Sequence, residues 1–200
     1  MLKLSDYSNH MMKTSFDVPN PPIKKSKKYI VYQDHLFFAL YSKINHIDKS
    51  VCNMSDYNET NEKIKIAECL ENLKFKNKEE IINNLVYDKV ITLPTFYILV
   101  TMFYKLNLIY IKERTYVDMK CDSEQPIVYI DYKGVFLETE PDLNSLLPIK
   151  LEKPLRPISF YKLGDLQTMS TQLAMDSEKK KKQELYDSIK TVLSSLYKIE

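Results

Sequence analysis

Glycine is almost absent from this chain of 200 residues. Its only two glycines are Gly134 and Gly164. A glycine-rich phosphate loop or a dinucleotide-binding fingerprint needs several glycines in a short stretch, because the backbone must approach the phosphates closely. The nucleotide enzymes that depend on such loops are therefore excluded, and so is a β-barrel whose bends are made by repeated glycines.

Cysteine and histidine are also scarce. The three cysteines, Cys52, Cys69 and Cys121, are widely spaced and odd in number. This pattern predicts neither a disulfide framework nor a zinc knuckle, and it favours free thiols in a reducing, intracellular compartment. The three histidines are dispersed, so no two of them share a helical face as metal ligands would. We expect no metal and no other cofactor.

The chain has no apolar run long enough to span a membrane. The longest, near residues 96–104, is interrupted by Thr101 and is far shorter than the roughly 20 residues that a membrane helix needs. The N-terminus lacks the apolar segment of a signal peptide. Hydrophobic residues make up 44% and charged residues 28% of the chain, which predicts a globular protein of one domain or one domain with a small appendage.

The net charge of +2 is unevenly distributed along the chain. Residues 1–30 carry six lysines and two aspartates, residues 31–152 carry fourteen basic and nineteen acidic groups, and residues 153–200 carry nine basic and six acidic groups. An acidic middle with two basic ends suggests that the ends contact an anion, although solvated charge is the commoner explanation of such a pattern.

Residues 1–28 are interpreted as a basic, proline-containing arm. Three prolines between residues 19 and 22 oppose a helix and favour an extended connector. Four lysines follow at once, and they are Lys24, Lys25, Lys27 and Lys28. The same short run is also compatible with a localisation signal.

Residues 29–140 predict a body that begins with helices. Asp34 is a good N-cap for a first helix, and Thr60 for a second. A shorter third helix covers residues 81–85. Thr92 is followed by Pro94, and a proline in the first turn of a helix lacks only an N–H that would be unpaired there anyway, so a fourth helix is expected.

The second part of the body is rich in β-forming residues. Strands are expected at residues 108–111, 115–119, 127–130 and 135–138. The last two form a hairpin, because Gly134 suits the positive-φ position of its turn. Helices followed by an antiparallel meander predict an α+β fold class.

Residues 141–159 contain four prolines and are interpreted as a linker or an irregular strap. Residues 160–200 then predict a small pair of helices, with apolar side chains recurring at helical spacing in both. The run Lys179–Lys182 falls at the start of the second helix. Four ammonium groups at the positive end of a helix dipole are unfavourable, unless an external anion relieves the repulsion.

The C-terminal segment resembles the SAP and Rho-N-like helix–extended loop–helix modules, which bind nucleic acid. The resemblance rests on residues 161–167 (YKLGDLQ), 173–175 (LAM) and 181–189 (KKQELYDSI), about 35 of the 200 residues. These match the family's Leu-x-x-Leu, a hydrophobic end of the first helix, and Lys-x-x-Leu-x-x-x-Ile in the second. The glycine usual in the family's loop is missing here.

The resemblance implies phosphate contacts by the loop and by the start of the second helix. Three or four such contacts give a salt slope of about −3 to −4, typical of sequence-independent binding to DNA or RNA. The candidate nucleic-acid-binding residues are Lys162, Lys179, Lys180, Lys181 and Lys182, together with Lys24, Lys25, Lys27 and Lys28 of the arm. Alternatively, the helix pair docks onto protein and its lysines are merely solvated.

The body also resembles the ovarian-tumour-type cysteine proteases. Residues 34–40 (DHLFFAL) match the family's Asp-x-x-Cys-Leu-Phe-x-Ala-Leu helix, and residues 106–111 (LNLIYI) match a later strand. His35 stands where the family has its catalytic cysteine, and no histidine lies near residues 129–132. An imidazole cannot replace a thiolate as the covalent acyl carrier, so the resemblance implies at most a catalytically dead relative. We expect no enzyme.

The combination of an α+β body, a proline-rich connector (residues 152–159, EKPLRPIS) and a C-terminal pair of helices resembles uncharacterised proteins of large nucleocytoplasmic DNA viruses. Lysine, asparagine, isoleucine and tyrosine are abundant, as is typical of AT-rich coding. The leading hypothesis is a non-enzymatic viral protein that binds nucleic acid through residues 160–200, helped by the basic arm. The alternative is a structural or scaffolding protein, such as a minor virion component, that docks onto other virion proteins. Either one would act in the virion or the host cytoplasm.

Overall fold

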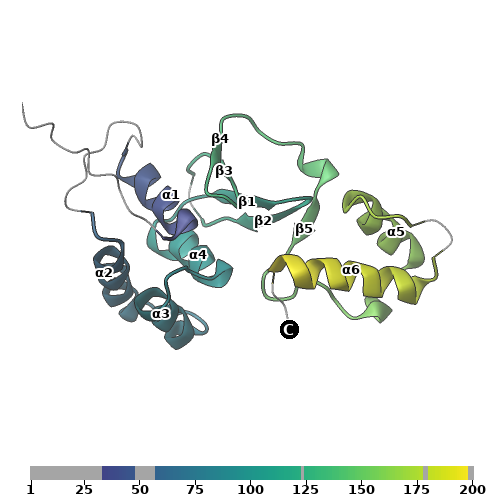
Figure 1. The fold of residues 1–200 in the computed structure, drawn as a ribbon, viewed down its shortest axis with the longest axis horizontal. Helices are drawn as coiled ribbons and strands as arrows, with labels where there is room; N and C mark the ends of the chain where they lie inside the picture. Colours follow the sequence, from purple (N-terminus) through teal and green to yellow (C-terminus); the bar gives the residue numbers. More distant parts are fainter. Residues whose placement is uncertain (1–32, 48–56, 123, 178–179, 198–200) are drawn as a thin grey trace, which may run out of the picture.

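A computed structural model describes residues 33–47, 57–122, 124–177 and 180–197 (Figure 1). Helices occupy the first half, a five-stranded sheet the middle and two helices the C-terminal part, which confirms the α+β fold class. The predicted arm, with its four candidate lysines, and Lys179 lie outside the described residues.

The first helix, α1 (His35–Ile44), begins where its cap predicts. One carboxylate oxygen of Asp34 accepts the backbone N–H of Phe37 at 3.0 Å. Phe37, Phe38 and Leu40 are almost fully buried, so this short helix is fixed mainly by its packing. α1 and α4 lie on the sheet side of the helical half, and α2 and α3 lie farther from the sheet (Figure 1).

The second helix, α2 (Glu59–Glu71), begins slightly earlier than predicted. Its N-cap is Asn58 and not Thr60, because the Asn58 side chain accepts the backbone N–H of Asn61 at 3.1 Å. The third helix, α3 (Lys78–Tyr87), packs against α2.

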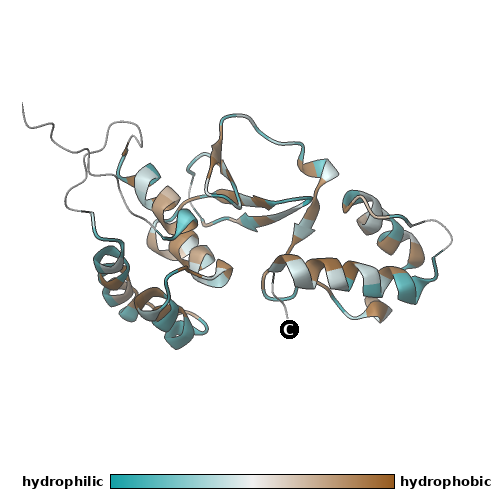
Figure 2. Cartoon of the chain, in the orientation of Figure 1, coloured by the Kyte–Doolittle hydropathy of each residue, from teal (hydrophilic) through white to brown (hydrophobic). Residues whose placement is uncertain are grey.

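The fourth helix, α4 (Leu93–Ile98), has the predicted cap, Thr92, and the predicted proline in its first turn. It continues as one π-helical turn, η1 (Leu99–Phe103). Figure 2 shows that α4 is largely hydrophobic, whereas α2 and α3 carry many hydrophilic residues. α4 is therefore part of the core, and α2 and α3 cover it.

The sheet has the strand order β4-β3-β1-β2-β5. Its strands are β1 (Leu108–Lys112), β2 (Thr115–Met119), β3 (Val128–Asp131), β4 (Phe136–Leu137) and β5 (Leu147–Ile149). The pairs β1–β2 and β3–β4 are antiparallel, as the predicted meander and its hairpin at Gly134 require. The pairs β1–β3 and β2–β5 are parallel, so the sheet is mixed and is not the antiparallel meander that the sequence predicts.

Asn107, buried immediately before β1, accounts for the parallel pairing of β3. Its side-chain oxygen accepts the backbone N–H of Cys121 at 3.0 Å, and its amide donates to the carbonyl of Gln125 at 2.9 Å. Its own carbonyl accepts the N–H of Val128 at 2.9 Å. These bonds hold the connection after β2 against the start of β1. β3 consequently begins beside β1 and runs parallel to it.

The proline-rich segment 141–159 contains part of the sheet. The backbone N–H of Leu147 donates to the carbonyl of Arg114 at 2.9 Å, which adds β5 at the edge beside β2. Two short 3-10 helices flank this strand, η2 (Leu143–Ser145) and η3 (Ile158–Phe160). A proline is tolerated in an edge strand because one side of that strand has no partner.

The C-terminal pair consists of α5 (Leu163–Gln172) and α6 (Lys182–Tyr197), as the helical spacing predicts. Leu166, Leu185, Ile189 and Leu193 are buried in the same hydrophobic cluster as the sheet and α1 to α4. The Lys112 ammonium donates to the carbonyl of Leu196, which joins the end of α6 to the β1–β2 hairpin. The pair therefore shares a core with the body.

Candidate functional site

Both helices of the C-terminal pair end at the same part of the sheet. At the end of α5, Gln172 donates to the carbonyls of Asn144 and Leu146, which lie just before β5. At the end of α6, the Tyr197 hydroxyl bonds the Thr115 hydroxyl. Thr115 is the register partner of Leu147, the first residue of β5. Both helices consequently begin at the opposite end, away from the sheet (Figure 1).

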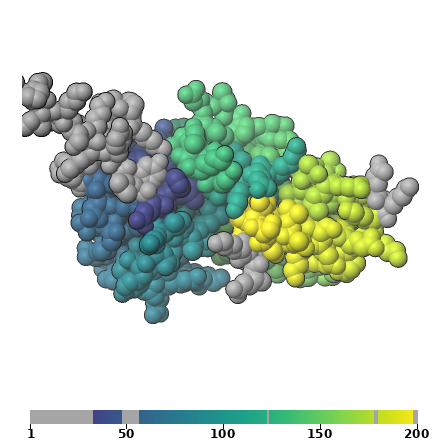
Figure 3. Space-filling model, in the orientation of Figure 1, coloured from purple at the N-terminus to yellow at the C-terminus, as the bar shows by residue number. Residues whose placement is uncertain are grey.

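This arrangement brings four of the predicted lysines to one end of the molecule. We call Lys162, Lys180, Lys181 and Lys182 the basic tip. Lys162 directly precedes α5, and the other three immediately precede or open α6. Tyr161 and Tyr186 show that the two helix starts are adjacent, because their ring centroids are 6.4 Å apart. Figure 3 shows the pair projecting from the body at this end.

Three carboxylates near the basic tip bind backbone or amide groups. Asp165 accepts the backbone N–H of Lys162 at 2.7 Å, and Glu184 accepts that of Lys181 at 3.0 Å. Asp187 accepts from the amide of Gln183. Within the described residues, none of the four tip lysines takes part in an ion pair. Their ammonium groups are therefore available to an external anion.

Beside the basic tip lies a set of aromatic and guanidinium groups that the sequence did not reveal. We call Arg156, Phe160, Tyr161 and Tyr186 the aromatic cluster. The guanidinium of Arg156 lies 4.1 Å from the ring centroid of Phe160, whose exposed fraction is 59%. Three of these residues belong to or flank the proline-rich segment, and Tyr186 joins them from α6. Neither apolar stripe of the predicted helices includes Phe160, so helical periodicity gives no signal for it.

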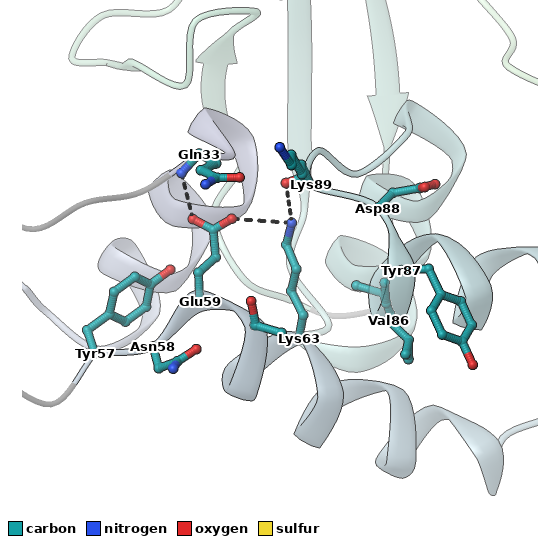
Figure 4. A pocket seen from close by; sticks show the side chains of 11 residues that line it. Gln33, Tyr57, Asn58, Glu59, Lys63, Val86, Tyr87, Asp88 and Lys89 are labelled. Atoms are coloured by element: carbon teal, nitrogen blue, oxygen red, sulfur yellow. Dashed lines mark hydrogen bonds and ion pairs between the residues drawn. The ribbon is translucent and has the colours of Figure 1, made fainter.

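A second candidate is a hollow of about 370 Å³ between α2 and α3 (Figure 4). Lys63 is buried at its floor, but its ammonium has three acceptors. They are Asp34 Oδ2 at 2.9 Å, the carbonyl of Lys89 at 2.8 Å and Glu59 Oε1 at 3.4 Å. An ammonium has three N–H donors, so this one has none left for a ligand. The hollow therefore lies over a structural ion pair, and the Lys63 ammonium at its floor does not provide a binding site for an anion.

The residues that carry the resemblance to cysteine proteases lie in α1 and in and just before β1. His35 is the first residue of α1 and is exposed, and the backbone of Gly134 in the β3–β4 turn packs against its carbonyl. Of the cysteines, Cys69 lies exposed on α2 and Cys121 follows β2, while Cys52 lies outside the described residues. In the described ranges, no three His, Cys, Asp or Glu side chains gather as metal ligands.

Comparisons with family models, with curated proteins and with solved structures find no significant match. Among the described residues, no helix has the length and apolar character needed to cross a membrane. We therefore infer function from the geometry and charge of the basic tip.

Proposed function

We propose that this is a non-enzymatic protein that binds nucleic acid through the phosphates, with the basic tip as its contact surface. The observation that carries the proposal is the convergence, at one end of the molecule, of two helix N-termini and four lysines that form no ion pair with any residue the structure describes. Backbone N–H groups at a helix N-terminus and nearby ammonium groups both favour an anion.

The number of lysines sets the strength of the binding. Three or four ammonium groups that each neutralise a phosphate give a slope of log K against log salt of about −3 to −4. Phosphate contacts carry no sequence information, so we expect weak binding to DNA and RNA without sequence preference. The basic arm, which precedes the described residues, would add to this slope.

The first test uses the full chain and point variants. Residues 153–200 should not be removed, because Leu166, Leu185 and Ile189 belong to the core of the body. Fluorescence anisotropy of a labelled oligonucleotide, measured at several salt concentrations, compares the unmodified protein with Lys180→Gln/Lys181→Gln/Lys182→Gln. We expect the affinity of the triple variant to fall by tenfold or more at low salt, and its slope to become shallower by about 2 to 3.

A matched control removes the same charge elsewhere. Lys74, Lys89 and Lys105 are exposed in loops of the helical half, away from the basic tip. Replacing these three by glutamine should leave the slope nearly unchanged. Equal losses in both triple variants would mean that binding depends on net charge alone and would contradict the proposed site. If even the unmodified protein does not bind at low salt, the helix pair is better explained as a surface that docks onto protein.

A further inference from the structure

We infer that the aromatic cluster makes the basic tip selective for single-stranded over duplex nucleic acid, because an unpaired base stacks on Phe160. This inference rests on the proposed function, since it assumes that the tip lysines hold a phosphate backbone nearby. It goes further by naming the form of nucleic acid and the residue that recognises it.

Phe160 occupies the position that such contact requires. It ends η3, two residues before Lys162, and exposes 59% of its surface. Leu163, three residues later and the first residue of α5, is 45% exposed. Large apolar side chains exposed together and surrounded by charged residues are typical of a binding surface. The guanidinium of Arg156 contacts the Phe160 ring, and Lys162 follows two residues later, so cations that complement phosphates adjoin the exposed ring.

The neighbours of Phe160 hold it in place while leaving it exposed. The ring of Tyr161 meets the Phe160 ring edge-on, with centroids 5.4 Å apart and an interplanar angle of 87°. The Tyr161 hydroxyl accepts the backbone N–H of Arg156 at 3.0 Å, and the Tyr186 hydroxyl donates to the Arg156 carbonyl at 3.0 Å. These bonds attach the segment that carries Phe160 to α6. A ring that is already immobilised loses little conformational entropy when a base stacks on it.

The chemistry of the cluster suits a base better than an aliphatic side chain. An aromatic ring and a guanidinium are both planar groups on which nucleobases stack. Stacking tolerates any base, because every base has a π face. In a duplex the faces of the bases already cover one another, so Phe160 can reach them only at an end. The tip lysines can bind the phosphates of both single-stranded and duplex nucleic acid. Only the single strand also offers a base that can stack on Phe160.

The experiment compares three labelled probes of about 15 nucleotides. They are a mixed-sequence single strand, a blunt duplex of the same sequence, and a strand of the same length in which every nucleotide is abasic. For the full-length protein we expect roughly tenfold tighter binding of the intact strand than of the other two, because the duplex offers base faces only at its ends and the abasic strand offers phosphates without bases.

Variants of Phe160 identify the contact. Phe160→Ala should lose this preference and keep the salt slope, because no charge changes. Phe160→Trp should retain the preference, and Phe160→Leu should behave as Phe160→Ala. The matched control is Tyr87→Ala, which removes an aromatic ring that is 79% exposed at the end of α3, far from the tip along the chain. Since Phe160 is exposed, all these variants should unfold at nearly the same temperature, as circular dichroism can verify.

The outcomes separate this inference from the proposed function. If the protein binds all three probes equally and the lysine variant loses binding, the proposed function stands and selectivity by stacking is overturned. Retention of the preference in Phe160→Leu also overturns stacking, since an apolar contact would then suffice. If no probe is bound at low salt, both proposals fail together.

Discussion

The two glycines differ in backbone conformation and in the space around them. Gly134 has φ +79°, and a Cβ built on it would lie 2.6 Å from the carbonyl oxygen of His35. The clash is with backbone, which cannot rotate away as a side chain can. Gly164 lies in the first turn of α5 with nothing within 4 Å of a Cβ position. The first glycine is required by the fold, and the second is not.

Gly134→Ala and Gly164→Ala should therefore change the free energy of unfolding in opposite directions. We expect Gly134→Ala to lose about 2 kcal/mol or more, from a disfavoured φ combined with steric overlap. Gly164→Ala should gain roughly 0.5 kcal/mol, because alanine restricts the unfolded chain and favours the helix. Urea unfolding of the two variants measures both values. A neutral Gly134→Ala would mean that the β3–β4 turn is not held against α1.

At the scale of elements, the Asp34–Lys63 ion pair joins three segments of the helical half. Asp34 caps α1, Lys63 extends from α2, and Asp34 also accepts the backbone N–H of Ile91, just before α4, at 2.7 Å. Both charged side chains are almost completely buried. Removal of Lys63 leaves the buried Asp34 carboxylate without a cation, with only the backbone N–H groups of Phe37 and Ile91 as donors.

Lys63→Met should consequently lower the free energy of unfolding by about 3 to 5 kcal/mol. The double variant Asp34→Ala/Lys63→Met should lose less than the sum of the two single variants, because neither charge is then left alone. The exposed pair Lys65–Glu62 is the control, and its removal should cost less than about 1 kcal/mol. The free energy of unfolding of every variant is measured with urea. If the losses of the two single variants at Asp34 and Lys63 simply add up in the double variant, this account is contradicted.

The elements that the sequence predicts well are those decided by neighbouring residues. The caps Asp34 and Thr92 and the turn at Gly134 each need only a few adjacent positions, and all three are confirmed. Strand order depends instead on hydrogen bonds between residues that are far apart in the sequence, such as those between Asn107 and both Cys121 and Gln125. A single asparagine before a strand gives no sign of such partners, so the sequence predicts a meander where the sheet is mixed.

The candidate site likewise has one part that the sequence predicts and one part that it does not. The lysine run is visible in the sequence, and so is the helix that it opens. The aromatic cluster is not, because Arg156 and Tyr186 are thirty positions apart and Arg156 lies among prolines that favour an irregular segment. Arg156 and Tyr186 come together only because α6 begins beside the start of α5.

At the scale of the whole molecule, buried and half-buried tyrosines connect stability to alkaline pH. Burial raises the pKa of Tyr104 to about 12, and it also raises the pKa of Tyr110 and Tyr197. In the unfolded chain a tyrosine ionises near pH 10. Above that pH the unfolded state loses protons that the folded state keeps. The stabilisation is therefore complete below about pH 10 and is lost as the pH rises through the folded-state values.

We expect the protein to unfold cooperatively above about pH 10, with the buried tyrosines ionising only as it unfolds. Absorbance of tyrosinate and far-ultraviolet circular dichroism, followed in one titration, should show a late absorbance step that coincides with the loss of helix. Tyr104→Phe should make the fall of stability with pH less steep. Complete ionisation of all fifteen tyrosines in a chain that stays helical would contradict the burial seen here.

The edge strand β5 has a consequence for the behaviour of the protein in concentrated solution. Successive N–H groups of a strand point to opposite sides, and Leu147 directs its N–H toward β2. The next residue, Pro148, therefore faces the open edge, and it is the one residue type with no N–H to offer. At the other edge, β4 is only two residues long. Both edges therefore disfavour the addition of a foreign strand, and we expect the folded protein to resist fibril growth by strand addition.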